Sequence, residues 1–313
     1  MGGRPERLLV IGDVGVDLVM GPIGDWPRVG TEILMDKSEV RPGGSAGNAV
    51  LAARYLGERA ELVSAVGSDE LGSWLRDQLD GEGAALAVCD GPTTLTVGVI
   101  HASGERTFFT TRGHLEQLTY ELLRPRVPPS GPGSIALLSG AFLTPALRAS
   151  YPRLIDELIR LGYRVALDTN WPPPGWSPAL RVEVAGWIAR CDHVLLNDLE
   201  VMSLADAATD LDTALARLAP RLKPGATLVA KSGERGAVAV ADGRRCECAA
   251  TRATIFDTVG AGDSFNAGYL LARLHGAGLD DALAAGCAAA ATILSSFPRR
   301  ALRDAGSPAL ERA

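Results

Sequence analysis

Short apolar runs that alternate with helical patterns constrain this fold more than any other feature of the sequence. The first run, Leu8–Gly12, is apolar throughout and ends in glycine, which is typical of a strand buried on both faces. Residues 45–57 form a helical pattern that begins at a good capping residue, Ser45, and ends at glycine. Such alternation predicts an α/β fold, a mostly parallel sheet with helices on both faces. The other expected strands are 61–66, 134–138, 163–167, 193–196 and 227–230, and the other expected helices are 70–81, 145–162 and 265–276.

Two stretches depart from this pattern. Residues 31–40 and 94–111 alternate apolar and polar side chains, and the second contains a turn at residues 103–105. Alternation of this kind predicts antiparallel strands with one solvated face. We therefore expect one α/β domain over residues 1–313, with a small β-sheet lid built from approximately residues 16–42 and 92–113. Because a small sheet has edges and a face to cover, we also expect a homodimer formed through this lid.

Composition narrows the class of protein. The 313 residues, 47% of them hydrophobic, are enough for one large core, and the net charge of −6 disfavours nucleic acid as a partner. No window reaches the roughly 18 apolar residues of a membrane span. The N-terminus lacks the apolar stretch of a signal peptide, and the five cysteines are scattered and odd in number. The sequence therefore predicts a soluble protein of a reducing compartment, the cytoplasm.

The most specific motif is DTVGAGDSF, residues 257–265, at the start of an expected helix. Its small residues Gly260, Ala261 and Gly262 let backbone N–H groups approach a ligand, and a helix start adds free donors and a positive dipole end. Together they predict an anion hole for a transferring phosphoryl group. Asp263 would then stand beside the anion, where it can accept the proton of an attacking hydroxyl. The alternative for GAGD alone is a helix that merely begins with glycine and an acidic first turn.

A second motif, RPGGSAGN at residues 41–48, joins the expected lid to a helix. Gly43 and Gly44 allow close backbone approach, and Asn48 offers a donor and an acceptor to a sugar hydroxyl. The alternative is a glycine turn with a helix cap. Residues 43–47 also match the G-x-S-x-G pattern of the nucleophile elbow of hydrolases, the sharp turn between a strand and a helix that presents the catalytic serine. That elbow must follow a buried strand, whereas the preceding segment here is polar and contains proline.

Three further groups of polar residues follow expected strands, where open parallel sheets bind ligands. Asp13 and Asp17 follow the first strand and could accept hydrogen bonds from a polyol, although one of them could instead cap a turn; we favour Asp17 as the residue that faces the ligand. Asn197 and Glu200 could order Mg²⁺ and phosphate through water, or form a reciprocal helix cap. The last group, which could line a nucleotide or form an ordinary hairpin turn, is Lys231, Ser232, Gly233 and Gly236.

With these motifs in order, the chain resembles the ribokinase-like, or phosphofructokinase-B, family of carbohydrate kinases. DTVGAGDSF resembles the second signature of that family, and PGGSAGN with its following helix resembles the first. The resemblance spans roughly residues 7–298. It implies a three-layer sandwich with a β lid, ATP with Mg²⁺, and transfer of the γ-phosphoryl group to a hydroxyl of a small-molecule sugar.

The resemblance also implies roles for individual residues. Asp263 would be the general base, with Gly260, Ala261 and Gly262 as the anion hole. Many relatives bind a monovalent cation such as K⁺ beside this hole, and Asp257 and the Val259 carbonyl stand where its ligands would be. The residues that would bind the substrate are Asp17, Gly43, Gly44 and Asn48. Magnesium and phosphate would be contacted by Asn197 and Glu200. The residues that would line the ATP site are Lys231, Ser232, Gly233 and Gly236.

The chain departs from the family in ways that leave the substrate open. Ribokinases carry a glutamate after the strand that here ends at Ser139 and Gly140, which weakens a ribose assignment. Relatives that act on sugar phosphates add a basic cluster, for which Arg41, Arg106 and Arg112 are candidates. Asp168 and Asn170 would face substrate or only shape their loop. One alternative is a nucleoside kinase with an aromatic slot made by Trp26, Phe108 and Phe109, and another is a sugar or nucleotide sensor without catalysis, which the intact Asp263 argues against.

Overall fold

The computed structural model describes residues 6–80, 83–131, 133–255, 257–297 and 299. Nine strands in this part of the chain form one large sheet, in the order β13-β12-β11-β10-β9-β8-β1-β4-β5. Seven of them are parallel, and β12 and β13 add antiparallel strands at one edge. These strands are β1 (Leu8–Gly12), β4 (Ala60–Gly67), β5 (Ala84–Cys89), β8 (Ile135–Ser139), β9 (Arg164–Asp168), β10 (His193–Asn197), β11 (Thr227–Lys231), β12 (Ala237–Ala241) and β13 (Arg244–Cys248).

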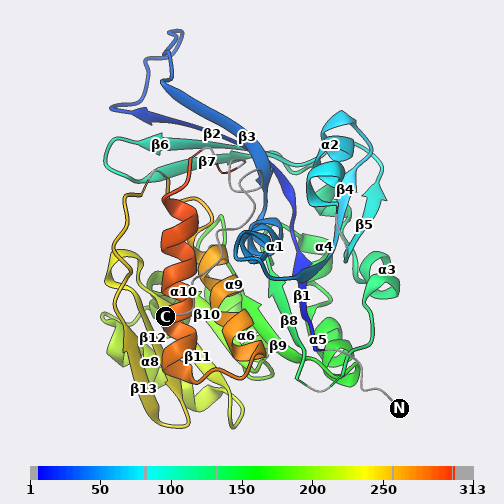
Figure 1. Ribbon diagram of the computed structural model, residues 1–313, viewed down its shortest axis with the longest axis vertical. Coiled ribbons are helices and arrows are strands. Elements are labelled where there is room, and N and C mark those ends of the chain that lie inside the picture. The colour runs from blue at the N-terminus through cyan, green and yellow to red at the C-terminus, as the bar shows by residue number, and fades with distance from the viewer. Residues whose placement is uncertain (1–5, 81–82, 132, 256, 298, 300–313) are drawn as a thin grey trace.

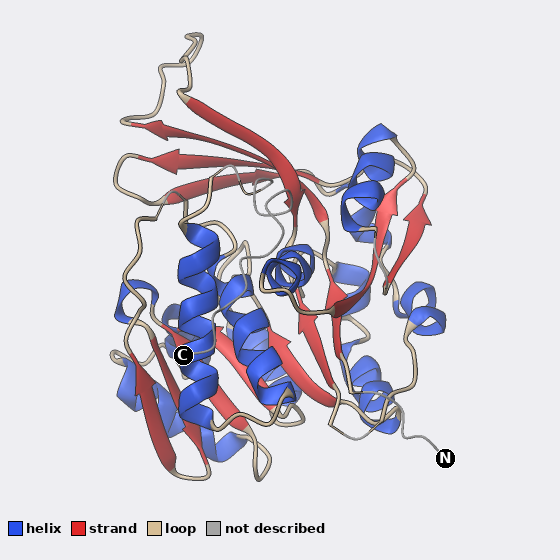
Figure 2. Cartoon of the chain, in the orientation of Figure 1, coloured by secondary structure: helices blue, strands red, loops and turns tan. Residues whose placement is uncertain are grey.

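Helices cover both faces of the large sheet (Figures 1 and 2). Alternate side chains of β1 enter two separate cores, Leu9 and Ile11 one of them and Leu8 and Val10 the other. The first core is closed by α3 (Tyr120–Leu123), α4 (Pro145–Arg148), α5 (Tyr151–Arg160), α6 (Pro178–Ile188), α7 (Asp198–Leu204) and α8 (Leu211–Leu218). The second is closed by α1 (Ser45–Tyr55), α2 (Glu70–Leu79), α9 (Ala261–Leu274) and α10 (Leu279–Leu294). The three-layer sandwich predicted from the sequence is confirmed.

A second, smaller sheet has the order β3-β2-β6-β7 and lies at the top of the view in Figure 1. Its strands are β2 (Gly15–Ile23), β3 (Lys37–Gly43), β6 (Leu95–His101) and β7 (Arg106–Thr110). The pair β2–β6 is parallel, and the pairs β2–β3 and β6–β7 are antiparallel. We call these four strands the small sheet. Strands β2 and β3 follow β1 and precede α1, whereas β6 and β7 follow β5. Both pairs leave the large sheet after the carboxyl end of a parallel strand, so the small sheet lies at that edge.

Three local expectations were wrong. The strand expected at residues 31–40 begins only at Lys37, because its partner β2 ends at Ile23 and leaves residues 24–36 without a strand to pair with. The helix expected over residues 145–162 is broken into α4 and α5, and Pro152, which has no N–H to donate, stands in the first turn of α5. Ser45 is the first helical residue of α1 rather than its cap.

None of the helices in the described ranges is both long enough and apolar enough to cross a membrane.

Candidate active site

The start of α9 carries the sharpest motif of the sequence. Its cap, Gly260, has a φ of 75°, in the left-handed region that favours glycine. Ser264 fixes this turn, because its backbone N–H and its hydroxyl both donate to the Gly260 carbonyl, at 2.9 and 2.8 Å. The first turn of a helix leaves its N–H groups without intrahelical acceptors and forms the positive end of the helix dipole. The turn from Gly260 to Gly262 is therefore suited to an anion.

Asp263 lies in that first turn and is 7% exposed. Helices α1 and α9 pack against each other, which brings the Asn48 amide to Asp263: Nδ2 donates to Oδ2 at 3.1 Å. Burial raises the pKa of the Asp263 carboxyl well above its ordinary value, and the negative charge of Asp168 raises it further. The charge of Lys231 and the hydrogen bond from Asn48 act in the opposite direction. Asp263 is thus a carboxylate with increased proton affinity beside an anion site.

Lys231, Asp168 and Asn266 form a buried polar cluster behind this turn. The Lys231 ammonium lies 2.6 Å from Asp168 Oδ2 and 3.1 Å from Asn266 Oδ1, and Asn266 Nδ2 donates to Asp168 Oδ2 at 2.6 Å. A Cβ built on Gly262 would lie 3.2 Å from Lys231 Nζ, so the ammonium stands next to the anion hole. Sequence reasoning missed Asn266, although it stands three residues after Asp263 on the same helix face.

Asp13 and Asp17 have different surroundings. Both carboxylate oxygens of Asp13 accept from the Ser45 N–H at 3.1 Å, so that Asp13 caps α1. Asp17, on β2, faces the backbone of Gly43: a Cβ on that glycine would lie 2.0 Å from Asp17 Cγ. Burial raises the pKa of Asp17 to about 7, although the charge of Arg41 opposes the shift. Asp13 is thus used by the fold as a helix cap, and the substrate role of Asp17 stays a prediction.

Asn197 and Glu200 form the reciprocal helix cap that the sequence left open. The Asn197 side chain accepts from the Glu200 N–H at 2.8 Å, and Glu200 Oε2 accepts from the Asn197 N–H at 2.8 Å. Burial raises the pKa of Glu200 to about 7, with the charge of Asp168 as a second cause. Asn197 ends β10 and Glu200 lies in the first turn of α7, at the same edge as Asp168 and Lys231, which end β9 and β11.

Residues 232–236 form the turn between the antiparallel strands β11 and β12, the hairpin alternative of the sequence analysis. The Ser232 N–H donates to the Gly236 carbonyl at 2.8 Å, and a short 3₁₀ turn spans Gly233–Arg235. The turn follows Lys231 directly in the sequence, and its nucleotide-lining role stays a prediction.

The loop after β8, where ribokinases carry a glutamate, is closed by Asn170. This residue has a φ of 60°, and its side-chain oxygen accepts from the Gly140 N–H at 2.8 Å. Asn170 therefore shapes the loop.

Asp257 was expected to face a monovalent cation, and the structure instead surrounds it with arginine. Arg41 donates to both of its carboxylate oxygens, at 3.0 and 3.1 Å, and Arg299 donates to Oδ1 at 2.9 Å. Arg41 thus has an internal partner, and the suggestion that it binds a substrate phosphate loses its support. Arg299 was missed by sequence reasoning, since no motif surrounds it.

A family model described as "pfkB family carbohydrate kinase" matches residues 5–300. The chain belongs to this family. Members of the pfkB family are phosphotransferases that act on an alcohol group, which agrees with an anion hole beside a buried carboxylate. The structure agrees with the argument against a hydrolase elbow at residues 43–47, because Ser45 follows β3, an antiparallel strand of the small sheet, and not a buried parallel strand.

Individual pfkB relatives are distant. A fructokinase from Klebsiella pneumoniae is 28% identical over 89% of this chain and 88% of its own length. The solved adenosine kinase from Sinorhizobium meliloti has a TM-score of 0.79 at 23% identity, over 96% of this chain and 99% of its own. The solved ribokinase from Arabidopsis thaliana, described as a complex with ribose and ATP, has a TM-score of 0.72 at 18% identity, over 96% and 98%. These two structures share the ribokinase-like fold with this protein.

Proposed function

We propose that this protein is an ATP-dependent carbohydrate kinase that transfers the γ-phosphoryl group of ATP to a hydroxyl of a sugar or sugar derivative, with Asp263 as the general base. The observation that carries the proposal is the place of Asp263: it lies in the first turn of α9, three residues after the left-handed Gly260, and accepts a hydrogen bond from Asn48. A base next to an anion hole is the arrangement that phosphoryl transfer to an alcohol requires.

The residues around Asp263 support this role. The Asn48 amide fixes the orientation of the Asp263 carboxylate. The raised pKa of Asp263 suits a group that takes a proton near neutral pH. The N–H groups at the start of α9 would stabilise charge on the transferred phosphoryl group, and the Lys231 ammonium beside Gly262 would add to that field. Phosphoryl transfer depends mainly on such positioning and charge stabilisation.

ATP and Mg²⁺ are the proposed co-substrate and metal. ATP is supported by the Arabidopsis ribokinase, whose structure is described as holding it. Mg²⁺ usually keeps several waters and uses one or two carboxylates together with phosphate oxygens, so it needs no complete protein site. Among the described residues no group of three or more His, Cys, Asp or Glu side chains could hold a metal. Glu200 and Asn197 fit this limited role, and we propose that they contact Mg²⁺ and phosphate through water, while residues 231–236 line the nucleotide.

The sugar is proposed to lie between Asp17, the Gly43–Gly44 backbone and Asn48, with the small sheet as a lid over it.

The experiment that tests the function is ATP consumption with Mg²⁺ against free sugars, sugar phosphates, sugar acids and nucleosides. We expect strong turnover with a sugar or sugar derivative. Turnover confined to nucleosides would support the alternative acceptor, in line with the adenosine kinase relative and with Trp26, which meets Phe109 edge-on at 5.9 Å. Binding of ATP without any turnover would favour a sensor, and absence of ATP binding would refute the proposal.

The substitution Gly43→Ala is expected to raise KM for the acceptor by about 10-fold to 100-fold and to leave the Kd of ATP unchanged. The new methyl group would overlap the Asp17 carboxylate and displace it, and the loss of a hydrogen bond to a charged group costs about 1.5–3 kcal/mol. Steady-state kinetics with the acceptor found above measure the effect. Gly186→Ala is the matched control, because a Cβ there meets nothing within 4 Å. An unchanged acceptor KM in Gly43→Ala would remove Asp17 from the sugar site.

We also propose that two copies pair through the small sheet. Its strand β7 is an edge strand, and Phe108 and Phe109 on it are 46% and 55% exposed. An open sheet edge is a template for pairing with another chain, and the two phenylalanines would add apolar surface to such a contact. Sedimentation at micromolar concentration is expected to give a dimer, and Phe109→Glu is expected to shift it to monomer. A wild-type monomer under these conditions would contradict the pairing.

A further inference from the structure

The Asp257 carboxylate is tied directly to the anion-hole turn. It stands three residues before Gly260, and its Oδ1 accepts from the Val259 N–H at 2.9 Å. Its side chain is only 3% exposed. A buried carboxylate needs a compensating positive charge, so whatever supplies that charge also holds the turn in place.

Two guanidinium groups supply it. Arg41, on β3, forms a two-bond contact with Asp257, Nη1 to Oδ2 at 3.0 Å and Nη2 to Oδ1 at 3.1 Å. Arg299 donates from Nη2 to Oδ1 at 2.9 Å. The two side chains are 5% and 6% exposed. Glu39 accepts from Arg41 at 3.3 Å. The charge of Arg41 also acts on the nearby Asp17 carboxyl. The positive charge beside Asp257 therefore comes from two guanidinium groups held by the protein itself.

The Arg299 guanidinium also occupies the position that a cation would need. A monovalent cation beside this turn would use the Asp257 carboxylate together with backbone carbonyl oxygens. Arg299 Nη2 already contacts that carboxylate and lies 3.5 Å from the Asp257 carbonyl oxygen. A Cβ built on Gly260 would lie 3.3 Å from Arg299 Nη1, so the group borders the anion hole itself. The residues present therefore do not fit a bound K⁺.

We propose that Arg41 and Arg299 act as positioning residues that replace the monovalent cation beside the anion hole, so that nucleotide binding and phosphoryl transfer by this protein are independent of K⁺. The proposal rests on the proposed kinase function for its second half. The replacement of the cation by guanidinium groups does not depend on catalysis, and the effect of K⁺ on Tm tests it separately.

The protonation states agree with this arrangement. Burial, followed by the charge of Arg41, lowers the pKa of Arg299 to about 10, which leaves the group charged at neutral pH. Burial alone would raise the pKa of Asp257, but the hydrogen bond from Arg41 and the charge of Arg299 hold it below its ordinary value. The pair is ionised on both sides over the whole range in which a kinase would be assayed.

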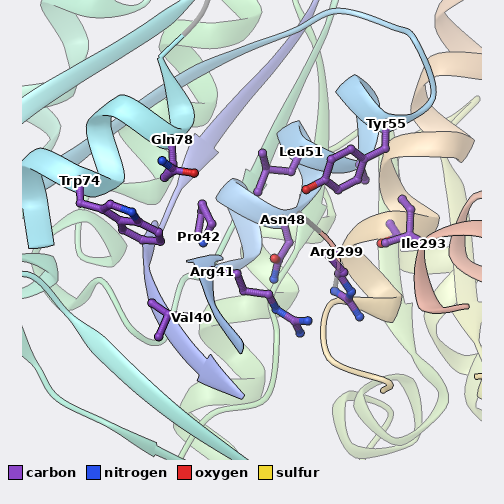
Figure 3. A pocket seen from close by; sticks show the side chains of 12 residues that line it. Val40, Arg41, Pro42, Asn48, Leu51, Tyr55, Trp74, Gln78, Ile293 and Arg299 are labelled. Carbon is purple, nitrogen blue, oxygen red and sulfur yellow. The ribbon is translucent and has the colours of Figure 1, made fainter. Parts of the chain in front are cut away.

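A pocket gives access to this cluster. Both arginines line a cavity of about 280 Å³ between β3, α1 and α2, together with Asn48, Tyr55 and Trp74. Figure 3 shows the side chains of Arg41 and Arg299 converging at one end of it. Shortening one guanidinium side chain would therefore open the Asp257 carboxylate to this cavity, and a small cation could enter in its place.

The wild-type protein provides the first test. We expect the Kd of Mg·ATP by calorimetry and the Tm to be the same, within about twofold and about 1 °C, in tetramethylammonium chloride and in KCl of equal ionic strength. A K⁺-specific gain of about tenfold in nucleotide affinity, or a clear rise in Tm with K⁺, would overturn the proposal. If ATP does not bind in either salt, the kinase function fails, while the Tm comparison still decides the cation site.

The substitution Arg299→Met provides the second test. It keeps an unbranched side chain but removes the charge, so that Tm and ATP affinity are expected to fall in tetramethylammonium and to recover in part with K⁺. Arg299→Lys, which keeps a cation, and Arg244→Met, which removes an exposed arginine on β13, are expected to show no K⁺ response. Should Arg299→Met not fold, Arg41→Met in the two salts gives the same comparison. An Arg→Met variant at either position that responds to K⁺ no more than the wild type would contradict the exchange of guanidinium for cation.

Discussion

The substitution Asp263→Asn is expected to lower kcat by about 100-fold to 10,000-fold while the Kd of ATP changes little. The amide has the same shape, and its oxygen can still accept the hydrogen bond from Asn48, but it cannot take the proton of the acceptor hydroxyl. Because the native carboxylate is buried and its pKa is raised, removal of the charge should not lower stability. Steady-state kinetics, calorimetry with ATP and a thermal melt measure the three effects.

The chain offers a matched control for this change. Asp280→Asn makes the same substitution in the first turn of the next helix, α10, where the side chain is exposed and paired with Arg244. We expect kcat within about twofold of wild type, because exposed ion pairs contribute little. Turnover by Asp263→Asn within about tenfold of wild type would refute its role as the general base.

The pH profile tests the same role without a substitution. Burial, and then the charge of Asp168, raise the pKa of Asp263, and a general base must be ionised to act. The value of kcat/KM should therefore increase as pH rises through this pKa, and its acid limb should lie well above the range of a free aspartate. In Asp263→Asn the limb should disappear from the residual activity. An acid limb at the ordinary aspartate value would mean that another group is titrating.

The strands of the large sheet could be predicted because the sequence of each parallel strand shows by itself that the strand is buried. A strand buried on both faces must be apolar along its whole length, and Leu8–Gly12 was located with the bounds it has in the structure. The small sheet was less predictable. In strand β2 the apolar run Leu18–Met20 is only three residues long, between Asp17 and the pair Gly21–Pro22. The start of β3 depends on where β2 ends, which alternation within residues 31–40 does not encode.

In the candidate active site, residues that are neighbours in sequence could be predicted, and contacts between distant residues could not. The anion-hole turn and Asp263 are neighbours in sequence, so that one motif describes them. The partners of this turn are distant: Asn48 lies 215 residues from Asp263, Asp168 lies 98 residues from Asn266, and Arg299 lies 42 residues from Asp257. The rule that ligands gather at the carboxyl ends of parallel strands predicts that Asp168 and Lys231 lie near each other, but not that they form an ion pair. Pairing depends on side-chain packing, which a single sequence does not reveal.

The substitution Lys231→Met is expected to destabilise the fold by about 3–5 kcal/mol and to weaken both ATP binding and turnover. It leaves the Asp168 carboxylate buried without its ammonium partner, which is the costly way to break a buried ion pair. It also removes the charge that lowers the pKa of Asp263, so the acid limb of the residual activity should move to higher pH. Urea unfolding, calorimetry and the pH profile measure these effects. Lys223→Met is the control: its pair with Asp192 is partly exposed, and we expect a loss of about 1 kcal/mol or less.

A second substitution separates the two roles of this lysine. In Lys231→Met/Asp168→Asn no buried charge is left unpaired, and the amide oxygen can still accept from Asn266 Nδ2, so most of the stability should return. ATP affinity and kcat should stay low, because the ammonium beside Gly262 is still missing. If the double variant recovers ATP binding along with stability, Lys231 serves only to neutralise Asp168. If it recovers neither, the ion pair is not what stabilises this edge of the sheet, and the cluster of Lys231, Asp168 and Asn266 has to be explained by the ligand it holds.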